Sequence, residues 1–77
     1  MPRSIFSEKQ EKLQALLRAA RLAAGLSQTE LAGRLGRPQS FVSKYENGER
    51  RLDIIELQEL CPALNISLSA FVRRFEK

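Results

Sequence analysis

The sequence predicts an all-α protein, a compact domain of five short helices. Apolar residues recur at spacings of three and four along most of the chain, which is the helical period, and no segment shows the alternation typical of a strand. Serine, aspartate, glycine and proline stand between these segments, where helices begin and end. The 77 residues suffice for one domain with a small core. We expect it at residues 8–77, after a flexible N-terminal arm at residues 1–7.

The first helix is expected to begin near Glu8. Its apolar residues form one stripe at the helical spacing: Leu13, Leu16, Leu17, Ala20 and Ala24. Gly25 follows this stripe, and glycine adopts the left-handed conformation of a helix C-terminus without steric cost. The first helix is therefore expected to end there.

A capping box predicts the start of the second helix. Ser27 and Glu30 have the S-x-x-E spacing in which each side chain satisfies a free backbone donor of the other residue. The residues expected to face inward are Leu31, Ala32 and Leu35. Gly36 is expected to end this helix and to form the turn that follows.

Pro38 fits the first turn of a third helix, because its φ is fixed and it lacks the N–H that would have no partner there. We expect this helix at about residues 38–47, with Val42 and Tyr45 on its inner face. Phe41 has two interpretations: it covers the core between the second and third helices, or it presents its ring to a thymine methyl group. We favour packing in the core.

A second capping box, Asp53 and Glu56, predicts the start of a fourth helix. The residues expected to face inward are Ile54, Leu57, Leu60 and Cys61. Pro62 then predicts a kink or an early stop, because it cannot donate to the carbonyl of Gln58 and its ring crowds the preceding turn.

Ser67 is expected to cap a fifth helix with a full apolar stripe. The stripe consists of Leu68, Phe71, Val72 and Phe75. It either closes the core of the monomer or forms a dimer interface with a second copy of the chain. We expect part of each, because such a small core gains from a partner subunit.

Composition narrows the function. The formal charge of +4 favours polyanionic partners such as nucleic acid. The chain has no histidine and a single cysteine, so we expect no disulfide within the chain, no metal site and no cofactor. Cys61 is interpreted as a small buried apolar residue rather than a redox group.

The acidic residues are spread along the expected helices without a nucleophile–base pair, so we expect no enzyme. Without a signal peptide or an apolar run long enough for a membrane span, we expect a cytoplasmic protein.

The segment from Gln28 to Tyr45 has the form of a helix-turn-helix, two short amphipathic helices broken at one glycine. The outward face of its second helix carries side chains able to hydrogen-bond base edges: Gln39, Ser40, Ser43 and Lys44. The alternative interpretation is that this face is simply solvated. The turn that precedes the helix favours contact with DNA over this alternative. Residues expected to contact DNA phosphates flank this face: Gln28, Arg37, Arg50 and Arg51.

From about Leu13 to Phe71 the chain resembles the Cro/C1-type (XRE-like) helix-turn-helix regulators. The matching residues are Arg21, Gly25-Leu26-Ser27-Gln28, Leu31-Ala32, Gly36, Gln39-Ser40, Val42-Ser43 and Tyr45-Glu46-Asn47-Gly48. The resemblance implies a lambda-repressor-like five-helix domain that binds a palindromic operator as a homodimer. It also implies a structural ion pair between Arg21 and Glu46. Leu52 and Pro62 depart from the family pattern, and Pro62 leaves the geometry of the fourth helix open.

Because it ends just after the fifth helix, the chain resembles short stand-alone members of the family, such as restriction-modification controller proteins and small phage repressors. The expected function is a sequence-specific transcriptional regulator whose partners are double-stranded DNA and a second copy of itself. RNA polymerase is a further candidate partner. The alternative is an antitoxin-like module that binds and neutralises a toxin-like protein through the stripe of the fifth helix or through the N-terminal arm, and represses its own operon.

Overall fold

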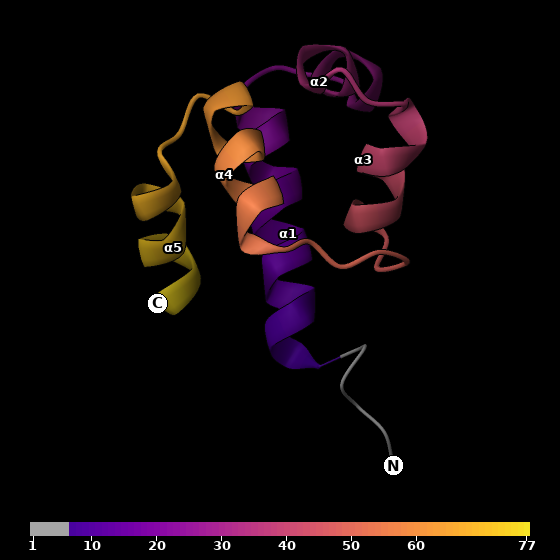
Figure 1. The fold of residues 1–77 in the computed structure, drawn as a ribbon. Helices are drawn as coiled ribbons and strands as arrows, with labels where there is room; N and C mark the ends of the chain where they lie inside the picture. The colour runs from indigo at the N-terminus through magenta and orange to yellow at the C-terminus, as the bar shows by residue number, and fades with distance from the viewer. Residues whose placement is uncertain (1–6) are drawn as a thin grey trace.

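The computed structural model describes residues 7–77 and confirms the expected all-α fold. Its helices are α1 (Glu8–Ala23), α2 (Gln28–Leu35), α3 (Gln39–Glu46), α4 (Ile54–Ala63) and α5 (Leu68–Glu76). Figure 1 shows α1 through the middle of the molecule, α2 across one end, α3 on one side and α5 on the other. Residues 1–6 of the expected arm lie outside the described residues, and Ser7 caps α1 by accepting a hydrogen bond from the backbone N–H of Gln10.

Every helix contributes to one core. α2 packs against α3 and α4, α1 packs against α3 and α5, and α4 packs against α5. The buried apolar residues are Leu17, Ala20, Leu26, Leu31, Ala32, Phe41, Val42, Tyr45, Leu60, Cys61, Leu64 and Phe71. Ala32 is buried in α2, and its small side chain lets neighbouring helices approach closely. α3 is therefore held from behind by both α1 and α2.

The capping residues that the sequence predicts begin α2, α4 and α5. Ser27 accepts a hydrogen bond from the Glu30 N–H at 3.0 Å, and the Glu30 carboxylate accepts one from the Ser27 N–H at 2.8 Å. Asp53 and Glu56 form the same reciprocal pair. Ser67 accepts from the backbone N–H of Ala70 at the start of α5. These hydrogen bonds satisfy donors that lack partners within the helices.

The turn between α2 and α3 is built on Gly36. Its φ of +66° lies in the left-handed region, which glycine enters without strain. This conformation lets the Arg37 N–H donate to the Ala32 carbonyl at 3.0 Å and closes α2. Pro38 then stands in an extended conformation with ψ 152° as the N-cap of α3, so the helix begins at Gln39, one residue later than expected.

Pro62 lies inside α4, which ends at Ala63 one residue later. A kink or an early stop was expected at this proline, and the helix stops early. The chain turns away through Asn65, whose φ is +61°, and the Ile66 N–H donates to the Cys61 carbonyl at 3.1 Å. Because Pro62 stands in the last turn, its missing N–H costs α4 only the hydrogen bond to the Gln58 carbonyl.

One expectation about burial is wrong. Ile54 was expected to face inward, yet its side chain is 61% exposed, because it stands in the first turn of α4, where no neighbouring helix covers it. Leu64 at the other end of the helix is buried instead. Part of the α5 stripe was expected in the monomer core and part in a dimer interface, with Phe71 among the interface candidates; Phe71 is 2% exposed, so it belongs to the part in the core.

Cys61 is fully buried in the core. Burial raises the pKa of its thiol above the ordinary value, because the charged thiolate is poorly solvated there. It therefore packs as the small apolar residue expected from the sequence. None of the helices formed by residues 7–77 is long and apolar enough to cross a membrane.

Candidate nucleic-acid interface

α3 has one buried face and one polar face. Phe41, Val42 and Tyr45 are buried against the rest of the domain. The residues predicted to read bases lie on the other side of the helix, where Gln39, Ser40 and Lys44 are exposed and Ser43 is half-buried. The structure therefore brings all four predicted base-reading residues together on the solvent-facing surface of one short helix.

A buried ion pair ties α1 to the C-terminal end of α3. Arg21 Nε lies 2.7 Å from Glu46 Oε2, and the Arg21 Nη2 donates to Glu46 Oε1 at 3.1 Å. The two side chains are only 8% and 3% exposed. Hydrogen bonding to Glu46 raises the pKa of Arg21 above its ordinary value. Arg21 also donates to the Leu26 carbonyl at 2.9 Å, so its charge is well satisfied.

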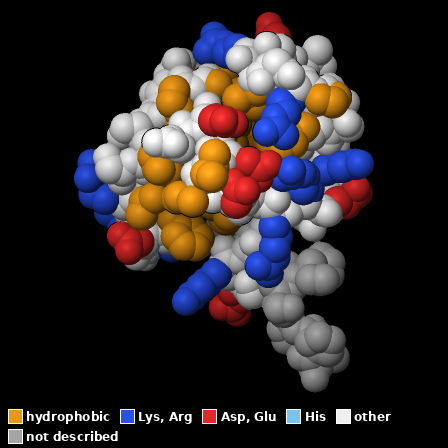
Figure 2. All heavy atoms as spheres, in the orientation of Figure 1, with side chains coloured by type: hydrophobic (Ala, Val, Ile, Leu, Met, Phe, Trp, Pro, Cys, Tyr) orange, Lys and Arg blue, Asp and Glu red, His pale blue; other side chains and the backbone are white. Residues whose placement is uncertain are grey.

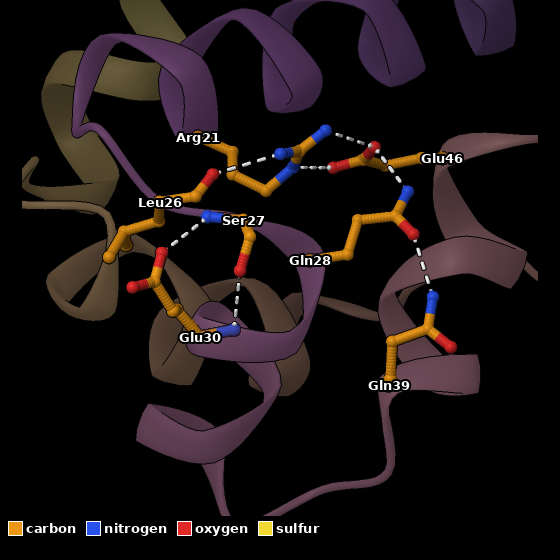
Figure 3. Close-up of polar contacts among 7 residues, drawn as sticks. All are labelled: Arg21, Leu26, Ser27, Gln28, Glu30, Gln39 and Glu46. Atoms are coloured by element: carbon orange, nitrogen blue, oxygen red, sulfur yellow. Dashed lines mark hydrogen bonds and ion pairs between the residues drawn. The ribbon is translucent and has the colours of Figure 1, made fainter.

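The ion pair continues through two glutamines to the exposed face of α3. Gln28, the first residue of α2, donates from Nε2 to Glu46 Oε1 at 3.0 Å. Gln39, the first residue of α3, donates from Nε2 to Gln28 Oε1 at 2.7 Å. Figure 3 shows this chain of side chains running from Arg21 to Gln39. The sequence predicted separate roles for Gln28 and Gln39 and missed the bond between them, although both stand at the first position of their helices.

A second cluster flanks α3 around the ring of Phe41. The guanidinium carbons of Arg37 and Arg50 lie 4.4 Å and 4.9 Å from the ring centroid. Phe41 is only 9% exposed, so it packs in the core as favoured from the sequence. Arg50 also makes two hydrogen bonds to the Glu56 carboxylate, at 2.7 and 3.0 Å. Glu56 was predicted only as a helix cap, and the sequence held no signal for this second role.

These arginines and Lys44 surround a shallow hollow beside α3. Its volume is about 380 Å³, and Arg37, Lys44 and Arg50 line it together with Ser40 and Glu49. Arg51 follows Arg50 and is exposed. Of the residues predicted to bind phosphates, Arg37 and Arg50 thus lie beside α3 in the structure, while the half-buried Gln28 lies at the start of α2.

Apolar side chains lie on a different part of the surface. Figure 2 shows the larger group of hydrophobic atoms in this view over α4 and α5, with a smaller group toward α3. Ile54 and Ile55 at the start of α4 are 61% and 63% exposed. From the predicted stripe of α5, Leu68, Val72 and Phe75 remain partly exposed. We call these five residues the α4–α5 face. The sequence did not single out Ile55, because its position in α4 does not follow the apolar period.

Comparison with known proteins places this arrangement in a family. Residues 17–71 match the family described as "Helix-turn-helix". That range includes α2 and α3 in full, the Arg21–Glu46 pair and most of the core. No curated protein matches the chain.

Solved structures agree in fold over nearly the whole chain. An XRE-family like protein from Pseudomonas syringae is 49% identical, with a TM-score of 0.87, and the match covers 96% of this chain and 90% of that one. The clp gene regulator ClgR from Corynebacterium glutamicum is 26% identical with a TM-score of 0.79, covering 91% and 74%. A point mutant of the restriction-modification controller protein C.Esp1396I is also 26% identical, with a TM-score of 0.83, covering 91% and 89%. The same controller, in a structure that is 24% identical to this chain, forms a tetramer in complex with its natural 35 base-pair operator.

Proposed function

The chain belongs to the helix-turn-helix family of DNA-binding regulators, which are not enzymes, and we propose that it is a sequence-specific transcriptional regulator that binds a palindromic operator as a homodimer. One observation carries the proposal: α3 presents Gln39, Ser40 and Lys44 to solvent, while α1 and α2 pack against the helix from behind. A helix that enters a major groove needs this combination of a presented face and a fixed support.

In this proposal, α3 reads the bases. Gln39 pairs with a base by two hydrogen bonds, Lys44 donates to guanine, and Ser40 and Ser43 donate or accept according to the base they meet. The exposure of Gln39, Ser40 and Lys44 in the free protein supports these roles. α3 is eight residues long, and these four side chains span its first six positions. It therefore contacts a short half-site.

The flanking residues bind the DNA backbone. Gln28 stands at the start of α2, where free backbone N–H groups and the helix dipole attract a phosphate. Arg37, Arg50 and Arg51 add positive charge beside α3. Such contacts fix the position of the protein on the duplex and raise affinity for every sequence alike. Arg50 forms an ion pair with Glu56 in the free protein. A phosphate that binds Arg50 therefore has to share its guanidinium group with Glu56 or displace the Glu56 carboxylate.

The second copy in the proposed dimer binds through the α4–α5 face. This face is apolar and partly exposed, whereas the predicted DNA-reading surface is polar and lies on another side of the molecule. A dimer built through the α4–α5 face therefore leaves both copies of α3 free. Two such helices address half-sites about one helical turn apart.

A mobility-shift assay tests the DNA-binding proposal. The folded protein is titrated onto the DNA upstream of its own gene, and onto random DNA of equal length, at moderate salt. We expect a discrete complex with the upstream DNA at protein concentrations at which random DNA stays unbound. Absence of any shift with folded protein would refute the proposal.

Two variants separate the proposed roles. Lys44→Ala should weaken binding to the specific site by about 1 to 3 kcal/mol and leave binding to random DNA nearly unchanged. Arg51→Ala should weaken binding to both DNAs alike and reduce the slope of log K against log salt by about one. Equal losses for both variants on both DNAs would contradict this division of roles.

A further inference from the structure

We propose that Glu56 positions Arg50 for DNA binding: it holds the Arg50 guanidinium group by one edge, so that a second edge binds one DNA phosphate. The phosphate is bound by the Nε–H and Nη2 donors of Arg50, while Glu56 keeps its own bonds. This inference rests on the proposed function, because it concerns a contact to DNA. At Arg50 it favours sharing of the guanidinium group over displacement of the carboxylate.

The donors of Arg50 are only partly used in the free protein. A guanidinium group has five N–H donors in a planar fork. Nη1 donates to the Arg51 carbonyl and to Glu56 Oε1, both at 3.0 Å, and Nη2 donates to Glu56 Oε2 at 2.7 Å. Within residues 7–77 no hydrogen bond uses the other two donors, Nε–H and the second N–H of Nη2. These two lie side by side on one edge of the fork, which suits two oxygens of one phosphate.

The chain uses the same edge for an oxyanion at Arg21. There Nε and Nη2 donate to the two carboxylate oxygens of Glu46 at 2.7 and 3.1 Å. Arg21 is buried, whereas the Arg50 side chain is 37% exposed and lines the hollow beside α3 together with Arg37 and Lys44. The corresponding edge of Arg50 is therefore available to an anion that enters this positively charged hollow.

Glu56 is itself held in place. Its Oε1 accepts a hydrogen bond from the backbone N–H of Asp53 at 3.0 Å, in the capping box that begins α4. The Glu56 side chain is only 13% exposed. A phosphate that displaced it from Arg50 would leave a largely buried carboxylate without its two charged hydrogen bonds, which is costly. Sharing avoids this cost, because the edge that Glu56 occupies is not the edge that the phosphate needs.

The ring of Phe41 supports the guanidinium group from another side. The Arg50 guanidinium carbon lies 4.9 Å from the ring centroid, and Phe41 is fixed in the core. A ring and a carboxylate thus order this long side chain before DNA arrives. Ordering such a side chain during binding weakens affinity, and an Arg50 that is already ordered avoids a loss of about 3- to 10-fold.

The binding experiment compares two substitutions that remove the same charge from α4. Glu56→Gln keeps an oxygen for the Asp53 N–H, since glutamine also completes a capping box, but it replaces the carboxylate that holds Arg50. Glu59→Gln is the matched control, because the Glu59 side chain is 62% exposed and its ion pair is with Arg37, at 3.9 Å. Fluorescence anisotropy at a fixed moderate salt concentration measures affinity for a random duplex, since a phosphate contact affects every sequence.

Glu56→Gln should bind the duplex about 3- to 10-fold more weakly than the natural chain, although it removes a negative charge. Glu59→Gln should bind as tightly as the natural chain or more tightly, because Arg50 stays in place. In an Arg50→Ala background, Glu56→Gln should no longer weaken binding, since the residue through which it acts is absent. Binding by folded Glu56→Gln as tight as that of Glu59→Gln, or an equal loss in the Arg50→Ala background, would overturn the inference. Thermal unfolding shows whether each variant is folded.

NMR of the arginine-labelled natural chain tests sharing without any substitution. In the free protein, couplings are expected across the hydrogen bonds from Arg50 Nη1 and Nη2 to the carboxylate carbon of Glu56. When the duplex is added, these couplings should persist while the Nε–H resonance of Arg50 moves. Loss of the couplings in the complex would mean that the phosphate displaces Glu56, which would overturn the inference.

Inorganic phosphate separates failure of this inference from failure of the proposed function. If the natural chain binds no DNA, the proposed function fails. A saturable shift of the Arg50 Nε–H resonance on titration with inorganic phosphate, with the couplings to Glu56 retained, would still support the anion-binding edge. An Nε–H resonance that moves with neither DNA nor inorganic phosphate would overturn it.

Discussion

At the scale of single residues, Tyr45 stands out in the core. Its side chain is 1% exposed, and its hydroxyl is the one buried side-chain polar atom without a hydrogen-bond partner among the described residues. The pKa of Tyr45 is raised far above its ordinary value. Burial is the larger cause, and the nearby negative charge of Glu46 is the next. An unpartnered buried hydroxyl opposes folding, because water solvates it in the unfolded chain.

Tyr45→Phe should therefore leave the free energy of unfolding unchanged or raise it by up to about 1 kcal/mol. The ring keeps its edge-to-face contact with Phe41, whose centroid lies 5.5 Å away. Urea unfolding followed by circular dichroism measures the difference. A loss larger than about 1 kcal/mol would mean that the hydroxyl has a stabilising partner after all.

Arg21 is the opposite case, a buried charge in which each of the three guanidinium nitrogens donates a hydrogen bond. Arg21→Met should lower the free energy of unfolding by about 3 to 5 kcal/mol, because it leaves Glu46 buried and unpaired. Arg18→Met provides the matched control on the same helix, since Arg18 is exposed, and should change stability by less than about 0.5 kcal/mol. Similar losses for both variants, measured by urea unfolding, would contradict the role of the buried pair.

Individual residue roles could be predicted from the sequence only where local spacing determines them. The polar face of α3 follows from the helical period alone, and all four of its predicted residues lie together. The bond between Gln28 and Gln39 joins residues 11 positions apart, and the two bonds from Arg50 to Glu56 cross from a loop to the next helix. Such contacts depend on how elements cross in space, which spacing along the chain does not specify.

At the scale of helices, starts were predicted better than burial. Ser27, Asp53 and Ser67 each cap the helix expected from the sequence, because a capping bond involves residues only three positions apart. Ile54 was misplaced because the helical period gives the direction of a side chain without showing whether another element covers it. The exposed first turn of α4 is a feature of the tertiary arrangement.

Ser27→Ala tests how much a cap contributes to the helix that supports α3. The substitution removes the acceptor for the Glu30 N–H and should lower the free energy of unfolding by about 1 kcal/mol. Ser69→Ala is the matched control, because Ser69 is exposed and its hydroxyl contacts that of Ser67, at 3.3 Å, rather than a backbone N–H at a helix N-terminus. It should change stability by less than about 0.5 kcal/mol. Equal effects of the two substitutions in urea unfolding would argue against the cap.

At the scale of the whole molecule, the dependence of stability on pH follows from the titrating groups. The chain has no histidine, so no side chain has an ordinary pKa between about 5 and 8. The pKa of Glu56 is lowered below its ordinary 4.5, first by the hydrogen bonds that Arg50 donates to it and second by the hydrogen bond from the backbone N–H of Asp53. The Ser27 N–H lowers the pKa of Glu30 in the same way. Both acids bind protons more weakly in the folded chain than in the unfolded one.

The free energy of unfolding should therefore stay level from about pH 8 to pH 5.5 and fall as the pH drops below about 4.5, where the unfolded chain takes up protons first. Thermal melts from pH 8 to pH 3 measure this profile. Glu56→Gln should show a shallower fall in acid, because one of the two shifted groups is gone. A transition centred near pH 6.5 would contradict the assignment, since nothing in the sequence titrates there.

The α4–α5 face predicts self-association. Ile54 and Ile55 are both more than 60% exposed, and burying such side chains against a second copy gains about 25 cal/mol per Å² of apolar surface. Sedimentation at micromolar concentration should give a dimer of the 8.7 kDa chain. Ile55→Lys should sediment as a monomer, because it places a charge in the contact. Leu22→Lys is the matched control, since Leu22 is 59% exposed at the end of α1, outside the face, and it should remain a dimer. A natural chain that sediments only as a monomer would contradict a stable dimer. Its α4–α5 face would then be exposed in solution, which would favour the antitoxin-like alternative, in which another protein covers this face.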